Sequence, residues 1–328
     1  MRISVLGLGN WGTALGNHLA NKGYDVLGWC LEEEVAQSIN NKNINPQYLT
    51  SVVLNPKLKA TNNIEDLFDC DYLLNVIPAN YLEGVFKKVK VNDKAIFVNA
   101  TKGLDPKTLA TPIDLAKKFI PNLTHYCVIS GPSFAKDIVI KKPAGIVCAC
   151  DTLSIATQVA KDFSSESLRI YSSDDVMGVE LGGILKNVIA IGVGVVDGLG
   201  LGDSARAGLI TRGLAEIMRL SFSMGAKKET LFGLSGLGDL VLTATCDTSR
   251  NRQIGLYLGQ GKSLEEAIVL AGSTAEGVFS APILKKLAEK YNVEMPISKN
   301  ILDLLNGEIT PMEMYQNLIN RPIKSEFD

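Results

Sequence analysis

A glycine-rich turn near the amino terminus has the spacing of a dinucleotide-binding loop. Gly7, Gly9 and Gly12 form the pattern GxGxxG between a short apolar run and an amphipathic stretch. In this pattern the first glycine permits a tight turn, the second lets the backbone approach a pyrophosphate, and the third lets helix and strand pack closely. The amides and dipole of the following helix then face the anion. We expect a dinucleotide here; the alternative is a glycine-rich turn without a ligand.

The end of the next strand would contact the ribose of such a cofactor. An acidic residue there binds the ribose hydroxyls of NAD, and an arginine accommodates the 2′-phosphate of NADP. Residues 30 to 33 read Cys-Leu-Glu-Glu, so Leu31 is not basic, although Lys42 could arrive from the following loop. Alternatively, residues 32 to 34 are the solvated start of a helix. The choice between NAD and NADP therefore stays open.

Lys186 is the only Asp, Glu, Lys or Arg residue between Glu180 and Asp197, in a stretch predicted to be an apolar helix. Burial disfavours the ammonium form and lowers the pKa of a lysine. Such a lysine could exchange protons near neutral pH, as reduction of a ketone or oxidation of an alcohol requires. The alternative is a lysine that extends to the surface or pairs with a carboxylate.

Asp239 lies in another apolar, glycine-rich segment, where a lone carboxylate needs a partner. Lys186 is a candidate for that partner. Thr243 comes one helical turn after Asp239, so both side chains would share a helix face and could address one ligand hydroxyl. Alternatively, Asp239 only caps a helix.

Residues 248 to 252 read Thr-Ser-Arg-Asn-Arg and precede a predicted helix. Hydroxyls, guanidinium groups and helix amides in one segment suit a phosphate, because an arginine donates two parallel hydrogen bonds to it. The alternative is a solvated surface turn.

Two further segments follow predicted strands and would lie at the carboxyl edge of a sheet, where open α/β folds bind ligands. Lys102 follows the strand of residues 95 to 99, and it is otherwise an ordinary loop lysine. Gly131 and Ser133 follow the strand that ends at Ile129 and could place backbone amides and a hydroxyl against a small ligand. Ser133 is not expected to be a nucleophile, since no histidine is near it in the sequence.

The elements that must position these residues change character near residue 173. Up to residue 172, short apolar runs alternate with amphipathic stretches, which predicts a Rossmann-like, doubly wound, mostly parallel sheet with both faces covered. From residue 174 the periodicity is that of helices. We therefore expect an α/β protein with a dinucleotide-binding domain at 1–173 and an all-helical substrate-binding domain at 174–328, which meet in a cleft. The expected strands are 3–6, 25–29, 72–77, 95–99, 126–129, 145–150 and 168–171.

Helices are expected over 13–21, 79–88, 108–119 and 154–163 in the first domain, and over 175–196, 204–224, 228–244, 251–259, 263–270, 278–291, 296–305 and 311–319 in the second. Ser263 and Glu266 have the spacing of a capping box, and Pro296 and Pro311 suit a first helical turn. The glycine-rich segment 197–203 is expected to be a mobile loop that could close over the cleft.

Composition narrows the class of protein. The chain has 328 residues, with 33 basic and 35 acidic side chains and a formal net charge of -2, so a nucleic-acid partner is not expected. It has two histidines and no CxxC pair among six cysteines, so we predict no metal site and a reducing compartment. The apolar stretch 181–196 is too short and too interrupted to insert in a membrane, and glycines interrupt the apolar amino terminus. A cytoplasmic homodimer is expected.

Six segments in register resemble the NAD(P)-dependent glycerol-3-phosphate dehydrogenases of the bacterial, soluble type. The resemblance runs through both predicted domains. The segments are residues 7–15, 100–104, 129–135, 185–190, 236–240 and 249–252.

This resemblance implies interconversion of dihydroxyacetone phosphate and sn-glycerol 3-phosphate by hydride transfer with NAD(P)H, for phospholipid biosynthesis. It implies that Lys186 is the proton donor and acceptor at the C2 oxygen. It places Lys102, Gly131, Ser133, Asp239, Ser249, Arg250 and Asn251 around the substrate, with Asn187 and Thr243 in supporting positions. It places Asn10, Trp11, Lys102, Ala135, Arg250 and Glu276 at the cofactor, besides Gly7, Gly9 and Gly12.

Many members of that family carry a basic residue at the end of the second strand, where this chain reads Trp-Cys-Leu-Glu over residues 29 to 32. This departure from the family pattern removes the residue that would indicate a preference for NADP. Two other functions are considered: a dehydrogenase of the 3-hydroxyacid or 6-phosphogluconate type, and a nucleotide-sensing protein without turnover. The second would keep the glycine loop but would not need a buried Lys186 beside Asp239.

Overall fold

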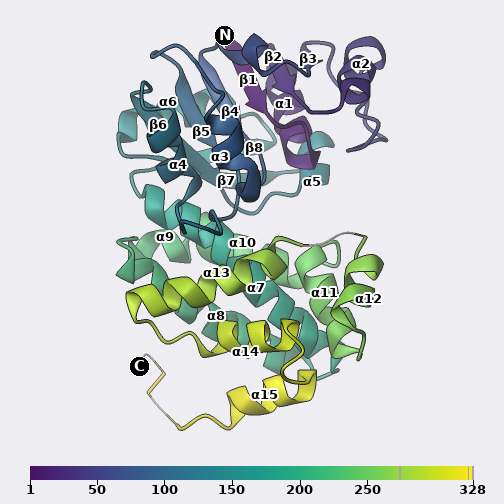
Figure 1. Ribbon diagram of the computed structural model, residues 1–328, viewed down its shortest axis with the longest axis vertical. Coiled ribbons are helices and arrows are strands. Elements are labelled where there is room, and N and C mark those ends of the chain that lie inside the picture. The colour runs from purple at the N-terminus through teal and green to yellow at the C-terminus, as the bar shows by residue number, and fades with distance from the viewer. Residues whose placement is uncertain (273–274, 324, 327–328) are drawn as a thin grey trace. The chain divides into compact units, whose positions relative to one another are not determined.

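The computed structural model describes residues 1–272, 275–323 and 325–326, and the chain divides into two compact units (Figure 1). Unit 1 is Met1–Glu180 and unit 2 is Leu181–Asp328. The sequence places the boundary at residue 173 instead. The difference arises in helix α7 (Val176–Gly198), because Val176 and Val179 pack in a hydrophobic cluster of unit 1.

Unit 1 is built on one eight-stranded sheet with the order β3-β2-β1-β4-β5-β6-β7-β8. Neighbouring strands are parallel except β6 and β7, which are antiparallel. The chain order reverses between β1 and β4, and open α/β sheets bind ligands outside the carboxyl ends of their strands at such a point. The strands are β1 (Arg2–Leu6), β2 (Asp25–Trp29), β3 (Leu58–Thr61), β4 (Tyr72–Asn75), β5 (Ile96–Asn99), β6 (His125–Ser130), β7 (Ala144–Cys150) and β8 (Leu168–Ser173).

Helices cover both faces of this sheet, as its two separate hydrophobic clusters show. Because successive side chains of a strand point to opposite faces, Ile96 and Val98 of β5 belong to one cluster and Phe97 to the other. Leu15 of α1 joins the first cluster and Leu115 of α4 the second. The helices of unit 1 are α1 (Asn10–Asn21), α2 (Glu33–Lys42), η1 (Ile64–Leu67), η2 (Ala79–Tyr81), α3 (Leu82–Phe86), α4 (Pro112–Phe119), α5 (Ala135–Val139) and α6 (Leu153–Phe163).

Several predicted elements of unit 1 differ from those observed. Sequence reasoning missed α2 and the edge strand β3, whose four residues are too few to show a clear alternation. Strand β4 ends at Asn75 rather than at residue 77, and the Asn75 side chain accepts a hydrogen bond from the Ile77 amide at 3.3 Å. The helix expected from residue 108 begins at Pro112, because Thr111 forms a capping box with Asp114.

Unit 2 is helical: every regular element among its described residues is a helix. The predicted fold class, a mostly parallel sheet followed by an all-helical region, is therefore confirmed. Its further helices are α8 (Asp203–Ser223), α9 (Lys228–Phe232), the π-helical turn η3 (Leu234–Gly238), α10 (Asp239–Thr245), α11 (Arg250–Gly259), α12 (Leu264–Leu270), α13 (Glu276–Tyr291), α14 (Pro296–Leu305) and α15 (Pro311–Ile319).

The predicted helix starts of α12, α14 and α15 are confirmed, whereas the single helix predicted over 228–244 is not observed. Ser263 and Glu266 form the predicted capping box of α12, and Pro296 and Pro311 occupy the first turns of α14 and α15. The single helix predicted over 228–244 is instead α9, η3 and α10, because the backbone at Gly233 is extended.

Helix α7 is the core helix of unit 2. Among the described residues it is the one helix long and apolar enough to cross a membrane, but its apolar window is fully buried. The expected mobile loop after it is shorter than predicted, since only residues 199–202 separate α7 from α8. Both ends of that connection are braced, because Arg206 binds Asp197 at 2.7 Å and Asp203 at 2.9 Å.

Candidate active site

The glycine loop between β1 and α1 has the backbone that a dinucleotide site needs. Gly7 has φ of +100°, which favours glycine. A Cβ atom on Gly12 would lie 1.8 Å from the carbonyl oxygen of Gly7, so only glycine lets α1 pack this close to the turn. A Cβ atom on Gly9, by contrast, would meet no atom within 4 Å. The loop thus leaves open space beside Gly9, directly before the first amides of α1.

Asn45 and Thr13 support this loop from the protein interior, and sequence reasoning missed Asn45. Its side-chain amide donates to the Leu8 carbonyl oxygen and to Thr13 Oγ1, both at 2.9 Å. Thr13 Oγ1 in turn donates to the same carbonyl oxygen at 2.9 Å. Asn45 is fully buried in a segment without regular structure, so no periodic pattern pointed to it. Of the predicted cofactor residues, Asn10 and Trp11 begin α1 directly after this loop.

The loop that carries Lys102 is held by two buried asparagines at the ends of β4 and β5. The Asn75 side chain donates to Asn99 Oδ1 at 2.9 Å and to Thr101 Oγ1 at 3.1 Å. The Asn99 side chain donates to the Thr101 carbonyl oxygen at 3.0 Å, and Gly103 follows with φ of +148°. The available signal was a terminal asparagine in two otherwise apolar strands.

Gly131, Ser133 and Ala135 follow β6, whose carboxyl end lies at the same sheet edge as that of β5 because the two strands are parallel. Gly131 has φ of +147°, and a Cβ atom there would lie 2.9 Å from the Cα atom of Ile146. Ser133 Oγ donates to the Gly131 carbonyl oxygen at 3.1 Å, and Ala135 begins α5. The predicted residues of unit 1 thus follow β1, β5 and β6 at one edge of the sheet.

The connection after β2 corrects one prediction. Leu31 is exposed, and Glu32 is the N-cap residue of α2 without a side-chain cap hydrogen bond. Lys42 does not lie in a following loop but in the last turn of α2. Ten helical residues span about 15 Å, so Lys42 lies at the opposite end of α2 from Glu32. The alternative of a helix start for residues 32 to 34 agrees with this structure.

Lys186 and Asp239 form a buried ion pair in unit 2. The Lys186 side chain is 7% exposed and the Asp239 side chain 2%. Lys186 Nζ donates to Asp239 Oδ1 and, at 2.6 Å, to Thr243 Oγ1. The predicted pairing and the shared helix face of Asp239 and Thr243 are therefore observed. A charge this buried is tolerated because a carboxylate and a hydroxyl both bind it.

A close backbone contact brings the two helices of this pair together. A Cβ atom on Gly182 in α7 would lie 2.6 Å from the carbonyl oxygen of Ser235 in η3. A Cβ atom on Gly236 would lie 2.1 Å from the carbonyl oxygen of Leu231. Gly182 thus lets η3 pack against α7, and Gly236 lets η3 lie close to the backbone of α9. Asp239 follows η3 immediately at the start of α10.

Asn187, Asn251 and Glu276 form a polar chain next to this pair. The Asn251 side chain donates to Asn187 Oδ1, and the Asn187 side chain donates to Glu276 Oε2, both at 3.0 Å. Asn251 Oδ1 also accepts a hydrogen bond from the Gly277 amide at 2.9 Å. The chain joins α7, α11 and the start of α13. Glu276, predicted from the resemblance to touch the cofactor, is here a partner of a predicted substrate residue.

The segment predicted to bind an anion forms the start of α11. Ser249 is its buried N-cap residue, and its hydroxyl accepts a hydrogen bond from the Arg252 amide at 3.4 Å. Arg250 is the first helical residue and is exposed, and Asn251 follows it. The cluster of unit 2 therefore combines a buried ammonium group, amide side chains and a ten-residue helix whose amino-terminal dipole favours anions.

Comparisons with known proteins match both halves of the chain to one family. The family model "NAD-dependent glycerol-3-phosphate dehydrogenase N-terminus" matches residues 2–156, and the corresponding C-terminus model matches residues 175–316. The chain is 41% identical to a glycerol-3-phosphate dehydrogenase (NAD(P)+) from Geobacter sulfurreducens over 99% of this chain and 98% of the relative. It is 42% identical to the protein of that name from Nitratidesulfovibrio vulgaris, over 99% of this chain and 100% of the relative.

A solved structure gives the same result. The crystal structure of glycerol-3-phosphate dehydrogenase from Coxiella burnetii matches with a TM-score of 0.92 and 35% sequence identity, covering 98% of this chain and 99% of that chain. With two family models that cover most of the sequence and full-length relatives above 40% identity, the chain belongs to the NAD-dependent glycerol-3-phosphate dehydrogenase family.

Proposed function

We propose that Lys186 is the acid and base in the reaction that this chain catalyses, the interconversion of dihydroxyacetone phosphate and sn-glycerol 3-phosphate with NAD(P)H. Besides family membership, the buried Lys186 ammonium group beside Asp239 and Thr243 carries this proposal. Reduction of a ketone needs a hydride and a proton. The reduced nicotinamide supplies the hydride when it is bound, and the protein supplies the proton.

Lys186 donates its proton to the C2 oxygen as the hydride arrives, and the neutral amine is then reprotonated from solvent. In the reverse direction the neutral amine accepts the proton of the C2 hydroxyl. Asp239 and Thr243 fix the position of Nζ, since both bind it. Asp239 also compensates the buried positive charge.

The substrate phosphate binds at the start of α11. Arg250 offers a planar guanidinium group, Ser249 a hydroxyl and Asn251 a side-chain amide, and the helix dipole adds a positive potential. Asn187 orients Asn251 through their hydrogen bond. In unit 1 the proposed substrate residues are Lys102, Gly131 and Ser133.

The dinucleotide pyrophosphate binds at Gly7, Gly9 and Gly12. Asn10, Trp11, Lys102, Ala135, Arg250 and Glu276 complete the proposed cofactor contacts. The cofactor is NAD or NADP, and residues 30 to 34 include no lysine or arginine that could bind a 2′-phosphate.

The proposed assembly is a homodimer, the commonest state of soluble oligomers. We place the enzyme in the cytoplasm, where its product supplies phospholipid synthesis. The proposed domain roles are cofactor binding for 1–173 and substrate binding for 174–328.

A direct assay tests this function. Purified protein is mixed with NADH and dihydroxyacetone phosphate, and oxidation is followed by the absorbance of reduced nicotinamide. Lys186→Ala is expected to lower kcat by about 100- to 10,000-fold, because the proton donor is lost, with little change in the Kd of NADH. Near-normal turnover in this variant would exclude Lys186 as the acid.

Controls separate chemistry from folding. Lys186→Ala leaves Asp239 buried without its ammonium partner, so the Tm is measured alongside, together with the double variant Lys186→Met/Asp239→Leu, which removes both charges. The exposed Lys42→Ala serves as the matched lysine control. Turnover of a 3-hydroxyacid or 6-phosphogluconate but not of dihydroxyacetone phosphate would favour those dehydrogenases, and no turnover at all would favour a binding protein.

A further inference from the structure

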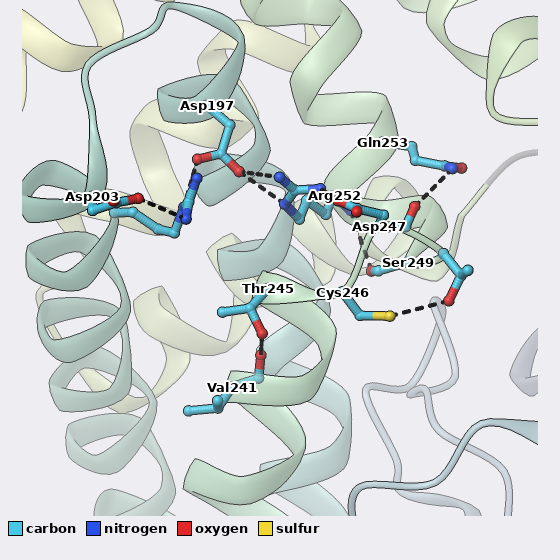
Figure 2. A network of polar contacts seen from close by, with 11 residues as sticks. Asp197, Asp203, Val241, Thr245, Cys246, Asp247, Ser249, Arg252 and Gln253 are labelled. Carbon is cyan, nitrogen blue, oxygen red and sulfur yellow. Dashed lines mark hydrogen bonds and ion pairs between the residues drawn. The ribbon is translucent and has the colours of Figure 1, made fainter. Parts of the chain in front are cut away.

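Arg252 is an almost buried arginine that the proposed reaction does not use. Its side chain is 11% exposed and lies between two carboxylates (Figure 2). Nε and Nη2 both contact Asp197 Oδ2, at 2.8 and 2.7 Å, and Nη1 contacts Asp247 Oδ1 at 2.7 Å. The guanidinium group thus joins the end of α7 to the turn that precedes α11.

Asp197 is the carboxylate that holds Arg252 on the side of α7. Its side chain is 5% exposed, and each of its oxygens has an arginine partner. Oδ2 accepts from Arg252, whereas Oδ1 accepts from Arg206 Nε at 2.7 Å. A buried carboxylate bound on both oxygens has little freedom to rotate, so it is a firm anchor for Arg252.

The backbones of α7 and α11 also touch at this point. A Cβ atom on Gly194 would lie 2.0 Å from the carbonyl oxygen of Arg252, and one on Gly255 would lie 1.9 Å from the carbonyl oxygen of Ile191. Asn251 bonds to Asn187 one turn earlier along the same helix pair. Arg252 therefore lies in the stretch where the backbones of α7 and α11 touch, and its ion pair with Asp197 adds a side-chain link between the same two helices.

The turn before α11 is braced by the same residue. Besides the ion pair with Arg252, Asp247 accepts a hydrogen bond at its carbonyl oxygen from the Gln253 side chain at 2.9 Å. The Arg252 amide donates to Ser249 Oγ at 3.4 Å (Figure 2). Backbone and side chain of Arg252 thus hold the two sides of the segment that carries Ser249 and Arg250.

We propose that Arg252 is a positioning residue for the substrate phosphate. By binding Asp197 and Asp247, it fixes Ser249, Arg250 and Asn251 relative to α7, the helix that carries Lys186 and Asn187. A substrate with a ketone at one end and a phosphate at the other reacts only if both anchors keep their spacing. The proposal rests on the function proposed above, and it adds that phosphate recognition depends on a residue outside the phosphate contacts.

The experiment compares Arg252→Met with Arg206→Met, because both arginines bind Asp197 but only Arg252 belongs to α11. Kinetic constants are measured with dihydroxyacetone phosphate and with unphosphorylated dihydroxyacetone, and the binding of inorganic phosphate is measured by calorimetry. For Arg252→Met we expect kcat/KM for the phosphorylated substrate and phosphate affinity to fall about 10- to 100-fold, since a displacement near 1 Å has effects of this size. The values for dihydroxyacetone and the Kd of NADH should change less than about twofold. Arg206→Met should lower the phosphate affinity clearly less than Arg252→Met does, because Asp197 then loses one partner while Arg252 keeps both of its carboxylates.

Arg252→Lys tests whether the planar guanidinium group, which binds Asp197 and Asp247 at the same time, is needed. Lysine keeps the charge but has a single ammonium group, so it should restore the phosphate affinity only in part. If lysine restores the phosphate affinity in full, the guanidinium geometry has no role in positioning. Equal losses for both substrates, or the same losses in Arg206→Met, would overturn the positioning role and leave a structural one.

Two further measurements keep the proposal testable. If Arg252→Met does not fold, Asp197→Asn retains an acceptor oxygen and should lower phosphate affinity without changing NADH binding; unchanged phosphate affinity would contradict the proposal. If the wild type does not reduce dihydroxyacetone phosphate, the proposed function fails. The calorimetric comparison of phosphate binding then still decides the role of Arg252.

Discussion

The glycine loop of unit 1, residues 7–12, depends on its backbone, whereas the polar cluster of unit 2 depends on its side chains. The loop consists of backbone: glycines, helix amides and neutral supports such as Asn45. The cluster consists of side chains, with buried charges at Lys186, Asp239 and Asp197. We therefore expect added atoms to disrupt the loop and the loss of a charge to disrupt the cluster.

The two regions differ because close steric contacts limit the loop, whereas the pairing of buried charges limits the cluster. A glycine turn is specified by close contacts, and one methyl group on Gly12 would occupy the space of a backbone oxygen. A buried charge is instead specified by its partners, and removal of one partner leaves the other uncompensated. Substitutions of opposite kinds should thus disable the two regions.

The largest effect is expected for Gly12→Ala compared with Gly9→Ala. In Gly12→Ala the new Cβ atom would lie 1.8 Å from the Gly7 carbonyl oxygen, so the turn must shift. We expect a loss of about 3 kcal/mol in the free energy of unfolding, together with loss of NADH binding. Denaturant titration and fluorescence titration with NADH measure the two effects.

Gly9→Ala is the matched control, because its Cβ atom would meet only open space and its φ of -69° suits alanine. Its stability should stay near that of the wild type while NADH binds more weakly. If Gly9→Ala binds NADH as tightly as the wild type does, the pyrophosphate does not lie at this position.

An intermediate effect is expected for Arg250→Met in unit 2. The variant lacks the guanidinium group proposed to bind the phosphate, and charge-assisted hydrogen bonds of this kind are worth about 1.5 to 3 kcal/mol. The kcat/KM for dihydroxyacetone phosphate should fall more than that for unphosphorylated dihydroxyacetone, as steady-state kinetics would show. Equal losses would argue against a phosphate contact by Arg250.

The smallest effect, when taken over a single pH unit, concerns Glu180, the last residue of unit 1. Burial raises its pKa to about 8, although Thr111 and the Ile113 amide donate to it. Between its ordinary pKa of 4.5 and about 8, the folded protein binds one more proton here than the unfolded chain does. The free energy of unfolding should therefore fall as the pH rises through this range, by about 1 kcal/mol from pH 6 to 7.

Glu180→Gln removes this titration, so the difference between the wild-type and variant stability profiles isolates it from other groups. His18, whose pKa burial lowers, and Glu216, whose pKa burial raises, contribute equally to both profiles. A difference that does not change with pH would show that Glu180 is ionised in the folded protein.

Much of the candidate site could be predicted because its sequence patterns are local. They are the spacing of the glycines and a single charged residue in a largely apolar stretch of a helix. The glycine pattern occupies six residues, and Lys186 is the one charged residue between Glu180 and Asp197 in a predicted apolar helix. Asp239 and Thr243 followed from the need of that charge for partners and from helical spacing. Their contact with Lys186 Nζ is observed, whereas the catalytic and binding roles of the predicted residues stay predictions.

The residues that hold the candidate site in place could not be predicted from local patterns. Asn75 and Asn99 are neutral residues at the ends of strands, and only the pairing of β4 with β5 makes them partners. Arg252 looked like a second phosphate ligand beside Arg250, because the sequence does not show which way each side chain points. Its carboxylate partner Asp197 is 55 residues away in the chain.

Periodicity, glycine spacing and charge imbalance are local properties, and they were enough to predict the mostly parallel sheet, the helical second half and the residues with reactive groups. Which of these groups meet depends instead on the packing of segments that are distant in the chain. The backbone contacts of Gly182, Gly194 and Gly255 set the packing of η3 and α11 against α7, and that packing determines where Asp239 and Arg252 bind. Such contacts depend on complementary surfaces distant in the chain, which no local pattern encodes.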